Sequence, residues 1–143
     1  MFEAANLSLC EALAGRASLV EVTLLPDGGV RVADDGPGAT FEPSGAAYAP
    51  GLGALLTKIL LGASAHTVPG LDLAVVNALS SRLVAAVRRE GIRQTREYVR
   101  GNQITRTTDA VSPDSSGTSI TFWRSACWNR RIRTSTPTRS AVG

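Results

Sequence analysis

The sequence has little lysine and little aromatic content, and it holds no long apolar run. Lys58 is the single lysine among fifteen basic residues. No apolar stretch approaches the roughly 20 residues that a membrane-spanning helix needs, so a helical span is excluded. Acidic Glu3 and Glu11 stand where a secretory signal would be basic, and we expect no such signal. Cys10 and Cys127 lack metal-binding spacing, which predicts free thiols and a cytoplasmic protein.

The charge is unevenly distributed along the 143 residues. Five arginines and no acid follow residue 123: Arg124, Arg130, Arg131, Arg133 and Arg139. The preceding part is mildly acidic and 43% of the whole chain is hydrophobic, which fits one globular domain. We therefore predict a domain over 1–123 and a basic tail over 124–143. The tail either contacts phosphates or anionic surfaces, or is a solvated terminus rich in Ser, Thr and Pro.

Hydrophobic periodicity and turn residues predict a small set of elements. We expect helices over 2–14, 52–63 and 71–81, and strands over 20–25, 30–34, 83–89, 93–100 and 119–123. Pro26-Asp27-Gly28-Gly29 predicts the turn of a hairpin between the first two strands. The order of elements indicates an α+β protein in two layers, with helices on one face of a mixed sheet.

The run Asp34-Asp35-Gly36-Pro37-Gly38 follows a predicted strand directly. Two glycines behind two carboxylates let the backbone approach a ligand while an acidic side chain binds it. The same run is also common in ordinary turns, so both interpretations remain open at this point.

Several short segments support a more specific interpretation. They are Phe2-Glu3, Glu11–Gly15, Val20–Leu25, Gly28–Gly36, Leu55–Lys58, Val75–Leu83, Arg88–Gly91 and Gly117–Trp123. Through them the chain resembles the N-terminal ATPase domain of the DNA gyrase B subunit and of topoisomerase IV, in the GHKL superfamily. The resemblance covers residues 2–123 and implies the Bergerat-type fold, a two-layer α/β sandwich.

The resemblance also implies roles for individual residues. Glu3 matches the family's catalytic general base, and Glu11 matches a second glutamate on the same helix. Asp34 matches the aspartate that binds the adenine amine, with Gly36 and Gly38 beside it. Thr118 matches a threonine that reaches the same base through water. Asp34 and Glu3 are therefore the candidate catalytic residues, while Glu11, Asp34, Gly36, Gly38 and Thr118 are the candidate ligand-binding residues.

The chain departs from the family where the metal and phosphates bind. Leu7 replaces the Mg²⁺-binding asparagine, and leucine offers no oxygen to a hard cation. Pro37 replaces an arginine that pairs with the second glutamate. The glycine-rich phosphate lid is reduced to 65–72, where Pro69 lacks an amide donor and Asp72 would repel a triphosphate. We therefore expect no metal and no bound cofactor, with weak or lost ATP binding.

Three functional hypotheses remain open. In the first, a degenerate ATP site binds another small ligand or a protein partner. In the second, the pocket is repurposed for acid–base chemistry such as a cyclisation or isomerisation, using Glu3, Glu11, Asp34, Cys10 and His66. In the third, residual ATP binding and slow hydrolysis persist. The chain begins at the first helix, so we expect neither the family's dimer-clasping arm nor DNA cleavage.

Overall fold

The computed structural model describes residues 12–42, 51–57 and 73–125. The described elements are β1 (Val20–Leu24), β2 (Val30–Asp34), α2 (Leu52–Thr57), α3 (Leu73–Ala78), β3 (Ser80–Arg89), β4 (Ile92–Val99), β5 (Asn102–Ala110) and β6 (Gly117–Arg124). Of the predicted first helix, residues 2–11 lie outside this description, as do the later part of the second helix and the tail beyond residue 125. No described helix is long and apolar enough to cross a membrane.

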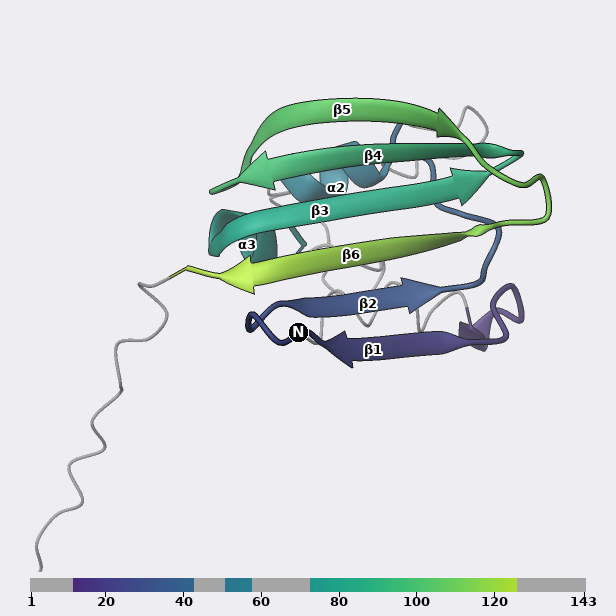
Figure 1. Ribbon diagram of the computed structural model, residues 1–143, viewed down its shortest axis with the longest axis horizontal. Helices are drawn as coiled ribbons and strands as arrows, with labels where there is room; N and C mark the ends of the chain where they lie inside the picture. The colour runs from purple at the N-terminus through teal and green to yellow at the C-terminus, as the bar shows by residue number, and fades with distance from the viewer. Residues whose placement is uncertain (1–11, 43–50, 58–72, 126–143) are drawn as a thin grey trace, which may run out of the picture.

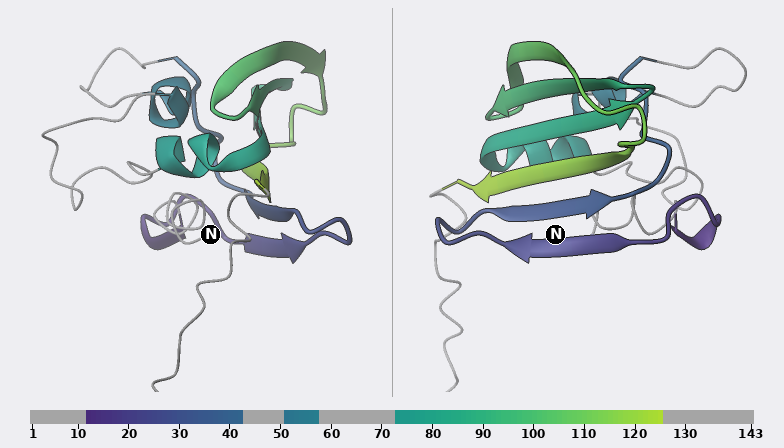
Figure 2. Two further views of the ribbon diagram at one scale, coloured as in Figure 1. Left: turned by 90° about the vertical axis from the view of Figure 1, so that its left-hand side faces the viewer. Right: turned by 45° about the vertical axis from the view of Figure 1, so that its right-hand side comes forward.

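One sheet of six strands forms the scaffold, in the order β1-β2-β6-β3-β4-β5 (Figure 1). All pairings between described strands are antiparallel. Both described helices lie on the same face of the sheet, which the edge-on view of Figure 2 makes plain. The two-layer α+β prediction is therefore confirmed, and β6 joins the N-terminal hairpin to the strands that follow the helices.

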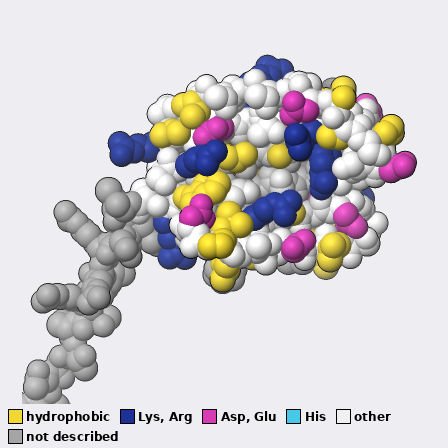
Figure 3. All heavy atoms as spheres, viewed as in Figure 1, with side chains coloured by type: hydrophobic (Ala, Val, Ile, Leu, Met, Phe, Trp, Pro, Cys, Tyr) yellow, Lys and Arg dark blue, Asp and Glu magenta, His cyan; other side chains and the backbone are white. Residues whose placement is uncertain are grey.

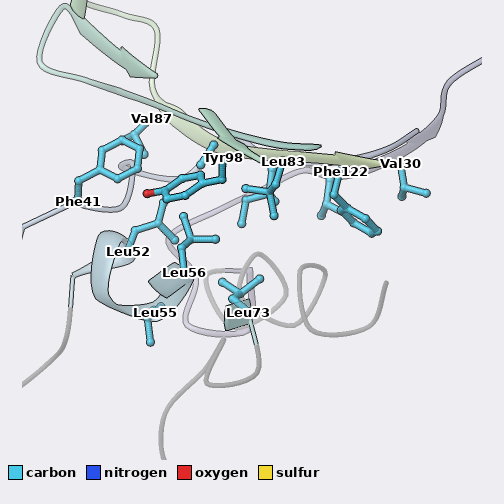
Figure 4. Packing of buried hydrophobic residues seen from close by; sticks show 13 residues of the cluster. Val30, Phe41, Leu52, Leu55, Leu56, Leu73, Leu83, Val87, Tyr98 and Phe122 are labelled. Carbon is cyan, nitrogen blue, oxygen red and sulfur yellow. The ribbon is translucent and has the colours of Figure 1, made fainter. Parts of the chain in front are cut away.

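The core lies between α2, α3 and the covered face of the sheet. Strand alternation directs Val30, Val32 and Asp34 toward the helices, because successive side chains of a strand point to opposite faces. Leu52, Leu55 and Leu56 supply the apolar stripe of α2. In Figure 4 Leu52 and Leu56 point toward Tyr98 and Leu83 of the sheet, both of which are fully buried. The predicted second helix is therefore confirmed over its described part, Leu52–Thr57.

The β1–β2 hairpin turns at the predicted glycines. Gly28 has a φ of 86°, a left-handed conformation that glycine adopts without steric strain. The turn is closed by the Leu25 amide donating to the Gly29 carbonyl and by the Gly28 amide donating to the Leu25 carbonyl. Trp123 packs against this turn, and its indole nitrogen donates to a carboxylate oxygen of Asp27 at 2.8 Å. The hairpin is thus anchored to β6 at its tip.

The structure corrects two predicted boundaries and adds one strand. Helix α3 ends at Ala78 and β3 begins at Ser80, so the predicted helix over 71–81 and strand from 83 are wrong at their junction. Strand β5 is absent from the predicted set. Its nine residues are all exposed and mostly polar, so it has no apolar face, and it forms through its ladder with β4 instead.

Candidate functional site

Asp34, the last residue of β2, is the buried acid at the centre of the predicted site. Its side chain points to the covered face of the sheet, and the residue is only 5% exposed. The Oδ1 atom accepts a hydrogen bond from the Gly36 amide at 3.0 Å and another from the Thr118 amide at 3.3 Å. Two backbone donors from different parts of the chain therefore hold the carboxylate in one orientation.

Thr118 connects this carboxylate to the segment that follows it. The Thr118 hydroxyl accepts a hydrogen bond from the Ala39 amide at 2.8 Å, and the residue is 4% exposed. The side chain thus bridges β6 and residues that are 79 positions earlier in the sequence. Asp34 and Thr118 are therefore neighbours, joined by the Thr118 amide, while the role predicted for each in binding a ligand stays a prediction.

Three glycines lie at close approaches in and around the Asp34 cluster. A Cβ atom on Gly36 would lie 3.1 Å from Asp34 Oδ1. A Cβ on Gly38, whose φ is +85°, would lie 2.6 Å from the Arg88 carbonyl oxygen. Gly117 is not among the predicted site residues, yet its Cβ would lie 2.0 Å from the Asp34 carbonyl oxygen. Gly38 and Gly117 have no room for a side chain, because the backbone approaches their Cβ positions too closely.

The neighbouring carboxylate, Asp35, binds backbone amides of the segment before β1. Asp35 is exposed and accepts hydrogen bonds from the Ser18 and Leu19 amides at 2.8 and 2.9 Å, and also from the Ser18 hydroxyl. The Ser18 hydroxyl, followed by these amides, lowers the pKa of the Asp35 carboxyl. Asp35 therefore fastens the segment before β1 to the end of β2. The ordinary-turn interpretation applies to this aspartate.

A hollow of about 220 Å³ opens beside the Asp34 cluster. Its described lining consists of Ala39, Thr40, Phe41, Glu42, Val87, Arg89, Glu90, Ile92 and Gln94. The lining combines apolar side chains with the charged residues Glu42, Arg89 and Glu90. Ala39 belongs to both the hollow and the Asp34 cluster, so the two features are adjacent.

The sequence did not predict Arg96, which pairs with Glu42 in the lining of the hollow. Arg96 is 7% exposed, and its Nη2 lies 2.6 Å from the Glu42 carboxylate. The guanidinium carbon also lies 4.3 Å from the centre of the Phe41 ring. The available signal was alternation: Arg96 occupies an inward position of β4, two residues before the buried Tyr98.

The structure thus brings together four predicted site residues: Asp34, Gly36, Gly38 and Thr118. Glu3 and Glu11, with Leu7, Cys10 and His66, lie outside the described residues, and so does the predicted lid. Within the described ranges, no group of three or more acidic, histidine or cysteine side chains could hold a metal ion. The roles predicted for these residues in ligand binding and catalysis remain predictions.

Comparison with curated proteins gives clear similarities, although no family model matches the chain. The chain is 36% identical over 129 residues to the DNA gyrase B protein of Streptomyces coelicolor, which covers 85% of this chain and 19% of that protein. It is 37% identical over 137 residues to the mitochondrial DNA gyrase B protein of Arabidopsis thaliana, covering 86% of this chain and 19% of that one. The chain therefore spans about a fifth of the length of these relatives.

A solved structure agrees with these sequence similarities. The crystal structure of the 43K ATPase domain of Thermus thermophilus gyrase B, in complex with an aminocoumarin, matches with a TM-score of 0.71. The sequences are 29% identical, and the match covers 87% of this chain and 32% of that chain. Fold and site together define a nucleotide-binding fold of the GHKL class. Within that class, the chain is homologous to the ATPase-domain region of DNA gyrase B.

Proposed function

We propose that this chain is a gyrase B-like ligand-binding domain that does not hydrolyse ATP efficiently. It binds a small planar molecule carrying a hydrogen-bond donor, held at one end by Asp34 and extending over the adjacent hollow. The first of the three hypotheses from the sequence allowed either a small ligand or a protein partner. The described residues around Asp34 support the small ligand.

The observation that carries this proposal is the fixed carboxylate of Asp34. A carboxylate can accept about four hydrogen bonds, so one group can serve both the backbone and a ligand. Because the group is held by the backbone before a ligand arrives, binding does not have to order it. Charge-assisted hydrogen bonds of this kind each contribute about 1.5–3 kcal/mol.

The hollow beside Asp34 suggests the shape of the ligand. Its lining includes the apolar residues Ala39, Val87 and Ile92, which suit the face of a flat ring. The structure of the Thermus thermophilus protein is a complex with an aminocoumarin. A curated relative from Streptomyces niveus is described as novobiocin-sensitive. We therefore choose novobiocin as one probe and ADP as the second.

The sequence supports the loss of efficient ATP hydrolysis. Leu7 stands where the family uses a metal-binding asparagine, and the segment 65–72 holds one glycine where the family has several. Without the metal ligand and the lid amides, the triphosphate loses several charge-assisted contacts. We expect Mg²⁺ to add little to nucleotide affinity.

The test is a binding titration with and without Asp34. Wild type should bind novobiocin or ADP in calorimetry, and Asp34→Asn should bind the same probe roughly tenfold more weakly or worse. Asparagine keeps one oxygen for the Gly36 and Thr118 amides, so the fold should survive. Asp109→Asn is the matched control, because this aspartate lies on the exposed edge strand and pairs with Arg93.

Two outcomes contradict the proposal. Equal affinity of wild type and Asp34→Asn would remove Asp34 from the site. A large rise in melting temperature with ATP and Mg²⁺, accompanied by phosphate release, would favour the residual ATPase hypothesis instead. Linkage predicts about 2.7 kcal/mol of stabilisation at a hundredfold excess over Kd, which thermal unfolding resolves easily.

A further inference from the structure

We propose that Arg96 is a positioning residue for the ligand site. It acts through residues 39–42, which form one wall of the hollow and reach Asp34 through Thr118. This inference rests on the proposed ligand-binding function, and it adds a residue of β4 to those that shape the site.

The guanidinium of Arg96 contacts two parts of the chain. Nη2 of Arg96 pairs with Glu42 at 2.6 Å, and the planar group lies over the Phe41 ring at 4.3 Å. On its other side, a Cβ atom built on Gly53 would lie 2.7 Å from Arg96 Nη1. The guanidinium therefore fits between the segment after β2 and the first turn of α2, with no room for a side chain at Gly53.

Backbone hydrogen bonds also join the segment after β2 to the first turn of α2. The Leu52 amide donates to the Thr40 carbonyl at 2.8 Å, and the Gly53 amide donates to the Phe41 carbonyl at 3.1 Å. Arg96 stands beside this junction. It therefore fixes where residues 40–42 lie relative to α2 and β4.

Residues 39–42 connect this junction to the predicted ligand site. Four consecutive residues, 39–42, belong to the lining of the hollow. Ala39 donates to the Thr118 hydroxyl, and the Thr118 amide donates to Asp34 Oδ1. Arg96 is not among the described lining residues, so its influence on a ligand must pass through this segment.

The burial of Arg96 argues against a role in stability alone. Its side chain is 8% exposed, whereas that of its partner Glu42 is 72% exposed. Its Nε atom is buried without a hydrogen-bond partner among the described residues. Burying a charge with one solvent-exposed partner is costly, and an apolar residue of similar size would often be at least as stable. Orientation of residues 39–42 accounts for what the guanidinium adds.

The experiment measures two quantities in Arg96→Gln, Arg96→Lys and Glu42→Gln. The first is amide hydrogen exchange at Ala39, which needs no ligand. The second is the Kd for novobiocin. Arg93→Gln is the matched control, because Arg93 is on the same strand and pairs with Asp109 on the exposed β5.

We expect Arg96→Gln to speed exchange at Ala39 and to weaken novobiocin binding roughly three- to tenfold. Exchange at amides of β2 should keep its wild-type rate, which separates local positioning from global loss of stability. Arg96→Lys should be intermediate, since lysine keeps the charge but not the planar fork. The Arg93→Gln control should match wild type.

Wild-type exchange at Ala39 and wild-type affinity in both Arg96 variants would overturn the inference. If Arg96→Gln does not fold, Glu42→Gln decides, because it removes the exposed partner and leaves the buried side chain in place. Unchanged exchange at Ala39 in that variant would also overturn it. If wild type binds neither probe, the proposed function fails separately, and exchange at Ala39 still tests the positioning by Arg96.

Discussion

At the scale of single residues, close backbone approach decides the shape of the candidate site. Gly117 has a φ of +139°, and its position leaves no space for a Cβ against the Asp34 backbone. Gly15 also has a positive φ, of +74°, but nothing lies within 4 Å of its Cβ position. An alanine at Gly15 would therefore meet backbone strain alone, whereas an alanine at Gly117 would meet both strain and steric overlap.

Gly117→Ala should lower the free energy of unfolding by roughly 2–4 kcal/mol, because strain and overlap add at this position. Gly15→Ala, which introduces strain alone, should cost about 1–2 kcal/mol. Urea unfolding of both variants checks the comparison. Equal losses would mean that the β6 and β2 backbones separate easily at Asp34.

At the scale of elements, the tip of the β1–β2 hairpin depends on a tryptophan from β6. Trp123 donates to Asp27, and a Cβ on Gly29 would lie 2.5 Å from its indole nitrogen. Arg82 of β3 lies 4.9 Å from the indole centre and pairs with Glu97 of β4 at 2.6 Å. The hairpin turn and strands β6, β3 and β4 are thereby connected on the face opposite the helices.

The tryptophan hydrogen bond is the largest cause of the lowered pKa of Asp27, followed by the Gly29 amide. Trp123→Phe should therefore raise the pKa of Asp27 toward its ordinary value of 3.8 and speed amide exchange in β1. NMR titration of the Asp27 carboxyl checks the first effect. Identical titration curves in wild type and Trp123→Phe would show that this bond has little effect in solution.

At the scale of the whole molecule, the sheet has one covered and one open face. Figure 3 shows the open face, where arginine, acidic and apolar side chains are intermixed over the strands. No single sign of charge dominates this face of the described part. Three carboxylates hold separate regions together: Asp27 binds Trp123 at the hairpin tip, Asp35 binds the segment before β1, and Glu42 binds Arg96 of β4.

All three carboxyls have a lowered pKa. Trp123 is the main cause for Asp27, Ser18 for Asp35 and the Arg96 hydrogen bond for Glu42. A folded pKa below the unfolded one gives stability that is fully present above the ordinary values of 3.8 and 4.5. This stability is lost as pH falls through the lower folded values.

The midpoint of urea unfolding should therefore stay nearly level above roughly pH 5.5 and fall steadily below about pH 4. A triple variant, Asp27→Asn, Asp35→Asn and Glu42→Gln, should be less stable near neutrality and less sensitive to acid. A triple variant with the full acid dependence of wild type would place the responsible groups elsewhere in the chain.

The elements that could be predicted are those whose signals are local. Alternating apolar residues and an Asp-Gly-Gly turn located β1 and β2, and the leucine stripe located the start of α2. The boundary between α3 and β3 failed because Leu79 and Ser80 fit either element until tertiary pairing places Ser80 opposite Arg124. Strand β5 failed because its residues bury no apolar face.

The order of the predicted helices and strands indicated the class of the fold, and the resemblance to the gyrase B family pointed to Asp34, Gly36, Gly38 and Thr118. Only the tertiary structure decided which distant side chains hold these residues and their neighbours in place. Arg96 meets Glu42 across 54 positions, and Thr118 meets Ala39 across 79. Such contacts depend on strand order and register, which bring distant segments together and are not encoded in any one segment.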